Sequence, residues 1–202
     1  QELYGTGRIK FSRAVIGSEA LAMKPNNIST DSASFKIKSK EKGKPYFNSP
    51  NSSLNLDLKT RKLNGQSNTK EASISFQKHQ YKTSIKGYQW NIDDKSMYMS
   101  TPENQSMSDA FMVTTDPKQD SLKFNTTAAY FDLETSTIEA KNIPHINIAD
   151  AQIYPSNGKI TIREDAEIRT LKNAKIKADT TYFFHEFQDA RIPCGIAAPA
   201  QL

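Results

Sequence analysis

The chain has 202 residues, of which 36% are hydrophobic and 24% are charged, and its formal net charge is +5. This length is enough to bury the core of one or two domains. So modest a charge and the scattered aromatic residues argue against a nucleic-acid-binding protein. No apolar stretch is long enough to cross a bilayer as a helix, and the single cysteine, Cys194, excludes an internal disulfide.

Apolar and polar residues alternate along most of the chain, and Gly, Pro, Asn and Ser separate the alternating runs. This pattern favours half-buried β-strands over disorder. Such runs occupy residues 9–15, 34–40, 72–76, 111–113 and 122–125. The best helical stripe, at residues 18–23, is no longer than two turns. The sequence therefore predicts an all-β fold.

A run of alternating lysines follows the first strands. It consists of Lys36, Lys38, Lys40, Lys42 and Lys44. If the strand continues through the run, the lysines project from one face as a cationic ladder, which could attract phosphate or an anionic glycan. A solvated strand face, or a sheet edge protected by lysines, is the commoner explanation of such a pattern.

A hairpin-like repeat occupies the front two thirds of the chain. Each copy has a strand, an Asp or Asn, a polar turn and a second strand. The copies are residues 54–63, 88–97 and 130–138. In the second copy Tyr88 and Trp90 share one face of the strand, and such a pair can form a stacking platform for sugar rings or lipid headgroups. More often a Tyr-Trp pair belongs to the core, with the indole N–H bonded at its rim.

A second repeat, Asp or Asn followed by Ala, a polar residue and Ile, fills the last third. Its copies are residues 150–153, 165–168, 173–176 and 189–192. In an extended chain Ala and Ile share one face, so we expect all eight of these side chains in one interior. The Asp or Asn is expected to form the corner of stacked β-units.

The two repeats suggest a division of the chain into segments. We expect a hairpin-repeat β-jellyroll segment over 1–142, a β-solenoid-like segment over 143–192 and a disordered tail over 193–202. One continuous stack of both repeats is the alternative. Whether the strands run parallel or antiparallel is left open.

Several short sequence segments, taken together, resemble segments of a known protein family. They are Tyr4–Gly7, Phe76–Tyr81, Gly87–Ile92, Gln119–Phe124 and Ile148–Pro155. As a set they resemble the large exported repeat proteins of Bacteroidetes-type bacteria. Those repeats are distantly similar to the OstA/LptA β-jellyroll segments that carry lipopolysaccharide across the periplasm. The resemblance implies a long β-scaffold in the periplasm, or at the outer membrane or cell surface, of a Gram-negative bacterium. The tail departs from the family's pattern, so we expect a piece of a longer chain.

Residues that could carry catalysis are few. The histidines show no metal-ligand spacing, so we expect no metal and no cofactor. They are His79, His145 and His185. Glu164, Asp165 and Glu167 could provide an acid and a base for glycoside hydrolysis, but Asp165 belongs to the repeated corner. The resemblance carries over no catalytic residues, and we expect no enzyme.

Three functions remain as hypotheses. The first is a non-enzymatic envelope scaffold that assists the transport or assembly of lipid, lipopolysaccharide or another outer-membrane component. The second is a structural stalk or adhesin-like module, and the third is a glycan-binding or glycan-active β-solenoid. An open apolar groove favours the first and a filled interior the second. We expect further repeats of the same or a longer chain as partners, head-to-tail association through exposed sheet edges, and lipid or anionic glycan as candidate ligands.

Overall fold

The computed structural model describes residues 3–40, 43–103, 105–179, 181–182 and 185–193. Over this part of the chain, eighteen strands form one antiparallel sheet that is not closed into a barrel. The prediction of an all-β fold is therefore confirmed. No helix in the described ranges is both long enough and apolar enough to span a membrane.

The sheet begins with antiparallel neighbours, three of which are long strands. They are β1 (Leu3–Lys10), β2 (Ala14–Lys24), β3 (Asn27–Ile37) and β4 (Phe47–Asp57). Alternate side chains of β3 and β4 are buried, as the period-2 pattern predicts. Residues 18–23, the best helical candidate, lie inside β2. Pairing on both sides of β2 overrides their weak helical stripe.

Beyond β4 the sheet divides into two arms. The second half of β4 pairs with the next strand of the first arm, and Asn48 near its start pairs with the second arm. The first arm consists of β5 (Lys62–Ser67), β8 (Gly87–Asn91), β9 (Ser96–Ser100), β12 (Ala128–Asp132), β13 (Thr137–Lys141) and β16 (Ile160–Ile162). The second arm consists of β6 (Ile74–Phe76), β7 (Tyr81–Thr83), β10 (Phe111–Thr114), β11 (Lys123–Asn125), β14 (Ile146–Ile148) and β15 (Ala151–Tyr154).

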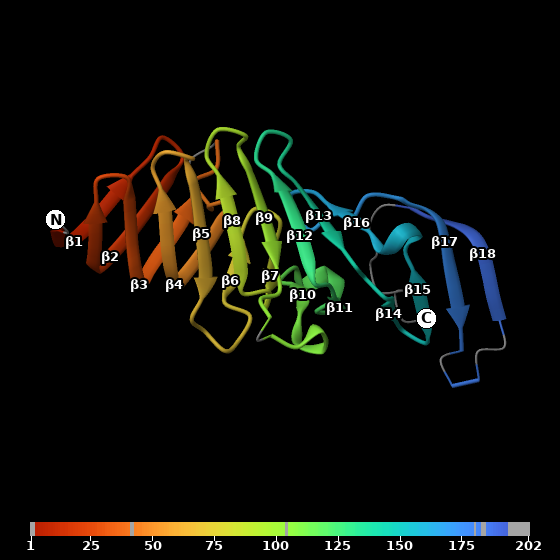
Figure 1. Cartoon of the computed structure of the whole chain (residues 1–202). Helices are drawn as coiled ribbons and strands as arrows, with labels where there is room; N and C mark the ends of the chain where they lie inside the picture. Colours follow the sequence, from red (N-terminus) through yellow and green to blue (C-terminus); the bar gives the residue numbers. More distant parts are fainter. Residues whose placement is uncertain (1–2, 41–42, 104, 180, 183–184, 194–202) are drawn as a thin grey trace.

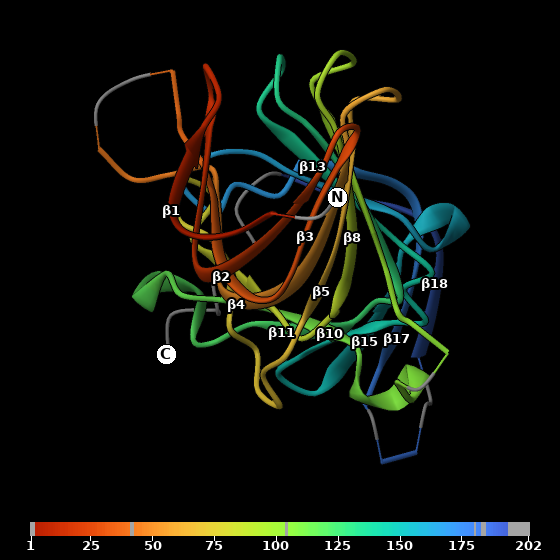
Figure 2. The same ribbon diagram turned by 60° about the vertical axis from the view of Figure 1, so that its left-hand side comes forward.

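The chain alternates between the arms, usually one hairpin at a time, so that both arms grow side by side (Figure 1). Figure 2 shows the arm of β5, β8 and β13 standing apart from that of β10, β11 and β15. Single-turn 3-10 helices lie in the connections. They are η1 (Met107–Asp109), η2 (Pro117–Gln119) and η3 (Ser156–Gly158). The last strands, β17 (Leu171–Ala178) and β18 (His185–Ile192), follow β15.

The predicted hairpin repeat is confirmed as β4–β5, which leads into the first arm, and as β8–β9 and β12–β13 within that arm. Asp57 accepts hydrogen bonds from the amides two and three residues on, at 2.7 and 3.0 Å. Asp132 does the same at 2.8 and 3.2 Å. Each turn then closes with a residue of positive φ. These residues are Arg61, Lys95 and Ser136. Side-chain capping of the turn amides thus explains why an Asp or Asn recurs there.

The Asp/Asn-Ala-x-Ile copies are only partly placed as expected. Four of their apolar side chains are buried, namely Ile153, Ala166, Ile168 and Ala174. The other four are half-buried, namely Ala151, Ile176, Ala190 and Ile192. Ile153 pairs with Ile176 in antiparallel register. The copies therefore do not stack as parallel rungs, and within the described ranges most residues of β18 are exposed.

The corner expected for the Asp or Asn is found at Asp150 and Asp165, which lie in turns, but not at Asn173 and Asp189, which lie inside β17 and β18. Asp165, Asn173 and Asp189 adopt left-handed backbone conformations, with φ of 54°, 53° and 52°. Asp and Asn tolerate this region better than most residues do. In β17 the register shifts around Asn173. The motif therefore marks irregularities that bend the strands.

Strands from residues 1–142 and from 143–192 belong to the same sheet. The structure thus joins both repeats in one continuous stack of strands. Apart from Pro193, the predicted tail lies outside the described residues.

Candidate functional site

The space between the arms is the natural place for a ligand, and side chains fill it. Phe76 of the second arm and Phe131 of the first arm are fully buried, and their ring centroids lie 5.5 Å apart. Phe47 meets Tyr88 in the same way at 5.1 Å. Such distances are those of packed aromatic pairs. The arms therefore share one aromatic core rather than enclose an open groove at these positions.

Tyr88 and Trp90, the candidate stacking platform, belong to this core. Their exposed fractions are 4% and 3%. The Tyr88 ring lies parallel to Phe35, and Phe11 meets the Trp90 ring edge-on at 5.7 Å. Burial raises the pKa of Tyr88 to about 12. The Trp90 Nε1 is buried without a hydrogen-bond partner among the described residues, contrary to the expected bond at the rim. Neither ring is accessible to a ligand from solvent.

The lysine ladder does not form as a strand face. Lys36 is exposed in β3, but the strand ends at Ile37. Lys38, Lys40 and Lys44 lie in the connection to β4, and Lys42 lies outside the described residues. The residues between these lysines are Ser39, Glu41 and Gly43, none of which has an apolar side chain to bury, and the described residues 38–40 and 43–45 form no strand. Because β3 is paired on both sides, its lysine protects no edge.

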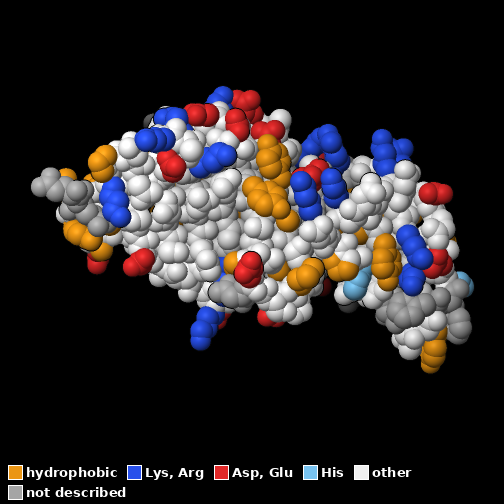
Figure 3. All heavy atoms as spheres, viewed as in Figure 1, with side chains coloured by type: hydrophobic (Ala, Val, Ile, Leu, Met, Phe, Trp, Pro, Cys, Tyr) orange, Lys and Arg blue, Asp and Glu red, His pale blue; other side chains and the backbone are white. Residues whose placement is uncertain are grey.

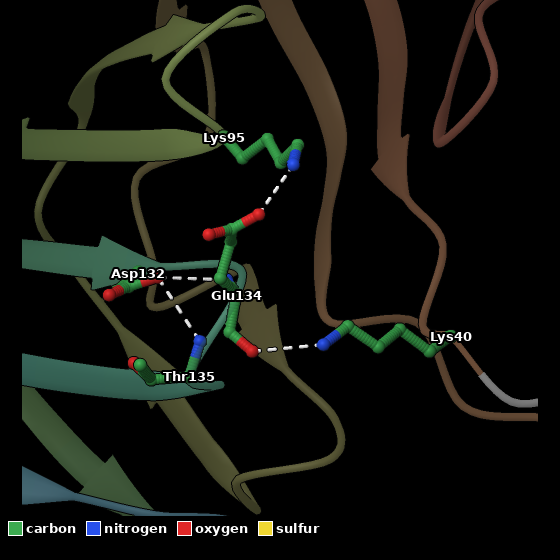
Figure 4. A network of polar contacts seen from close by, with 5 residues as sticks. All are labelled: Lys40, Lys95, Asp132, Glu134 and Thr135. Atoms are coloured by element: carbon green, nitrogen blue, oxygen red, sulfur yellow. Dashed lines mark hydrogen bonds and ion pairs between the residues drawn. The ribbon is translucent and has the colours of Figure 1, made fainter.

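Lys40 instead ties the β3–β4 connection to the β12–β13 turn of the first arm (Figure 4). Its Nζ donates to the backbone carbonyl of Glu134 in the β12–β13 turn at 2.9 Å. The Glu134 carboxylate pairs with Lys95, and that hydrogen bond lowers the pKa of Glu134. Burial pushes the pKa of Asp132 up, but the amides of Thr135 and Glu134 outweigh it, and the net pKa is lowered. The turn is thus held from both sides.

His79 joins the two arms along one rim, where the β6–β7 turn of the second arm meets the β12–β13 turn of the first arm. It lies in the β6–β7 turn and is fully buried, and its Nε2 lies 3.0 Å from the carbonyl oxygen of Ser136. Since a carbonyl only accepts, Nε2 carries the proton. The ring meets Phe131 edge-on at 5.2 Å, and in the described part of the chain Nδ1 has no hydrogen-bond partner. Burial lowers the pKa of His79, while the Ser136 carbonyl, Glu164 and Asp165 oppose the shift.

This lowered pKa predicts a pH dependence of stability. Between the folded-state pKa and the ordinary value of 6.5, the unfolded chain binds more protons at His79 than the folded chain does. The free energy of unfolding should therefore fall as the pH drops below 6.5, with a slope from this group of at most about 1.4 kcal/mol per pH unit. Urea unfolding above and below that pH measures the slope. His79→Gln, which keeps a donor for Ser136, should flatten it, and an unchanged slope would contradict the assignment.

Residues 163–167 complete the contact between the rims. The amide of Ala166 donates to the carbonyl of His79 at 3.1 Å, and Gln119 Nε2 donates to the carbonyl of Ala166 at 2.7 Å. A depression of about 400 Å³ lies over this segment and the β12–β13 turn. The contacts are made by loops and side chains, not by a ladder of paired strands.

The candidate acid and base residues lie at this depression, each with a polar partner. Glu164 accepts a hydrogen bond from the Ser136 hydroxyl at 2.7 Å. Asp165 accepts one from Gln80 at 3.5 Å, and Glu167 pairs with Arg163 at 3.4 Å. Each of the three carboxylates thus has a polar contact within the protein that explains its position in the structure.

The histidines are not brought together around a ligand. His145 packs against Tyr154 with ring centroids 5.7 Å apart, and His185 is exposed in β18. Over the described ranges no group of three or more His, Cys, Asp or Glu side chains could hold a metal ion. The contacts of His79 and Gln119 were not predicted, because their partners are distant in sequence and no local motif marks them.

Comparisons of the chain with protein-family models, with curated proteins and with solved structures find no match.

Proposed function

We propose that this chain is a non-enzymatic structural module of the cell envelope, part of a stalk or scaffold that grows by pairing with further repeats. The observation that carries the proposal is the filled interior. Tyr46 and Phe76 reach across to Phe131 at 5.8 and 5.5 Å, where an acyl chain would need empty space. The envelope location rests on the resemblance of the repeats.

The sheet ends support growth by strand pairing. In the described ranges β1 pairs with β2 and β18 pairs with β17, and the two strands lie at opposite ends of the molecule (Figure 1). Leu3 and Tyr4 of β1 are 68% and 75% exposed, and Phe187 of β18 is 55% exposed. Open edges with exposed apolar side chains readily accept another strand. A second copy of the chain could therefore extend the sheet at either end.

A second candidate is an envelope scaffold that assists the transport or assembly of lipid, lipopolysaccharide or another outer-membrane component. One observation favours it: loops and side chains hold the turns of the two arms together, as at His79 and Gln119. Arms held in this way could separate without breaking a strand ladder. The apolar core would then be exposed to an acyl chain.

Native mass spectrometry of the protein purified from an envelope extract, over a concentration series, separates the two functions. We expect species at integer multiples of the chain mass, because the edges pair, and no lipid mass. Phe187→Lys should reduce the oligomers, since a lysine on an edge strand opposes pairing. Leu58→Lys, at an exposed turn residue, is the matched control. Lipid that remains bound would favour the scaffold that assists lipid transport. A strictly monomeric protein would contradict growth by edge pairing.

A further inference from the structure

One continuous row of side chains crosses the outer face of the first arm. The register of the strands places one residue of each strand opposite the next, from β3 to β16. In order, these residues are Ser29, Asn55, Asn64, Gln89, Tyr98, Tyr130, Glu139 and Thr161. Their neighbours along the strands from β4 to β16 are core residues such as Leu63 and Met97, so these row side chains point away from the core. We call this set the outer row.

An exposed aromatic pair lies in the middle of the outer row. Tyr98 of β9 is 45% exposed, and Tyr130, directly opposite on β12, is 39% exposed. Ser96 and Ser100 flank Tyr98 on the same face, and these small side chains leave its ring uncovered. Figure 3 shows hydrophobic side chains gathered over β9 and β12 on this face. The two rings therefore form a small apolar patch on the outer face, and Lys141 Nζ lies over the Tyr130 ring, 5.9 Å from its centroid.

Uncharged hydrogen-bonding groups continue the row toward β3. Gln89 Nε2 donates to Asn64 Oδ1 at 2.7 Å. Each amide side chain has two donors and an acceptor with two lone pairs, so both keep capacity for a ligand. From Ser29 to Tyr130 the outer row carries no formal charge. The first charged member is Glu139, which pairs with Lys141 at 3.3 Å and with Lys159 at 3.6 Å.

We propose that the outer row binds a neutral, β-linked polysaccharide that lies across the strands. The apolar C–H faces of pyranose rings stack on Tyr98 and Tyr130, and the amides of Gln89 and Asn64 bond sugar hydroxyls. Adjacent strands lie about 4.8 Å apart, close to the length of one sugar unit in an extended β-linked chain. Successive sugars thus meet successive strands of the sheet.

Other occupants fit this surface less well. A nucleic acid needs cations for its phosphates, whereas the members of the outer row from β3 to β12 are uncharged, and Lys141 beside Tyr130 is paired with Glu139. A protein partner that adds a strand needs free backbone groups, whereas β8, β9 and β12 are each paired on both sides. The absence of charge on the row therefore favours an uncharged polymer. This binding activity goes beyond the structural role proposed above.

Affinity electrophoresis of the whole chain tests the proposal. The probes are hydroxyethylcellulose, laminarin and xylan, with dextran sulfate as a polyanion. We expect at least one neutral probe to retard the protein. The double variant Tyr98→Ala, Tyr130→Ala should weaken binding about tenfold or more, while the double change to Phe keeps the stacking faces and most of the affinity. Tyr182→Ala is the matched control, since Tyr182 is 67% exposed and lies outside the outer row.

A second variant protects the test against misfolding. Asn64→Ala with Gln89→Ala removes hydrogen bonds but no ring, and it should also weaken binding while the far-UV circular dichroism stays unchanged. The proposal is overturned if no neutral probe retards the natural chain, or if both double variants bind as tightly as it does. A preference for dextran sulfate that disappears with salt would also overturn it, because a neutral ligand gives little salt dependence.

Discussion

Replacing Phe131 with alanine should lower the free energy of unfolding by about 3–5 kcal/mol. Phe131 is fully buried on β12, and its ring meets Tyr46, Phe76 and His79 at centroid distances of 5.8, 5.5 and 5.2 Å. All three partners come from outside the first arm. The substitution therefore leaves a cavity at the place where the arms meet, and urea unfolding measures its cost.

The adjacent residue on the same strand provides the control. Tyr130 is 39% exposed on the outer face, so Tyr130→Ala should change the free energy of unfolding by only about 0.5 kcal/mol. Both variants remove an aromatic ring from β12 and differ in which face of the sheet loses it. Equal losses from the two variants would mean that the space between the arms is not the core.

Ile168→Ala should cost about 2–5 kcal/mol. Ile168 is 1% exposed and bridges to Ile162, the last residue of β16. Its truncation removes packing where the chain leaves the first arm. Thermal or urea unfolding of the variant measures the loss.

Ile176→Ala should cost less, although both isoleucines hold the same position in the repeated tetrapeptide. Ile176 is half-buried in β17, opposite Ile153 on one side and Phe187 on the other. Part of its side chain already contacts water, so its truncation removes less buried apolar surface. A larger loss at Ile176 than at Ile168 would show that the last strands are more deeply packed than in this structure.

Local chemistry accounts for the features that the sequence predicts correctly. Alternation of apolar and polar residues produces a half-buried strand wherever that strand lies. An Asp such as Asp132, which can cap the amides two and three residues on, specifies a turn without distant partners. The all-β fold and the three hairpins can therefore be predicted from the sequence alone.

The candidate ligand sites were less predictable, because alternation does not say which face of a strand becomes the interior. Tyr88 and Trp90 share a face, which is compatible with an exposed platform or with the commoner case, a core pair, and the structure places both in the core. The exposed pair is Tyr98 and Tyr130, which lie on different strands and meet only through the register of β9 and β12. No motif within a single strand marks such a pair.

By itself, the sequence of this protein determined the strands and the hairpin turns, because these depend on neighbouring residues. Only the tertiary structure decided the division into two arms and the contacts between distant turns that hold the arms in place. His79 meets a carbonyl 57 residues away, and Lys40 meets one 94 residues away. Such contacts form when the sheet brings distant turns together, and neither periodicity nor spacing along the chain encodes them.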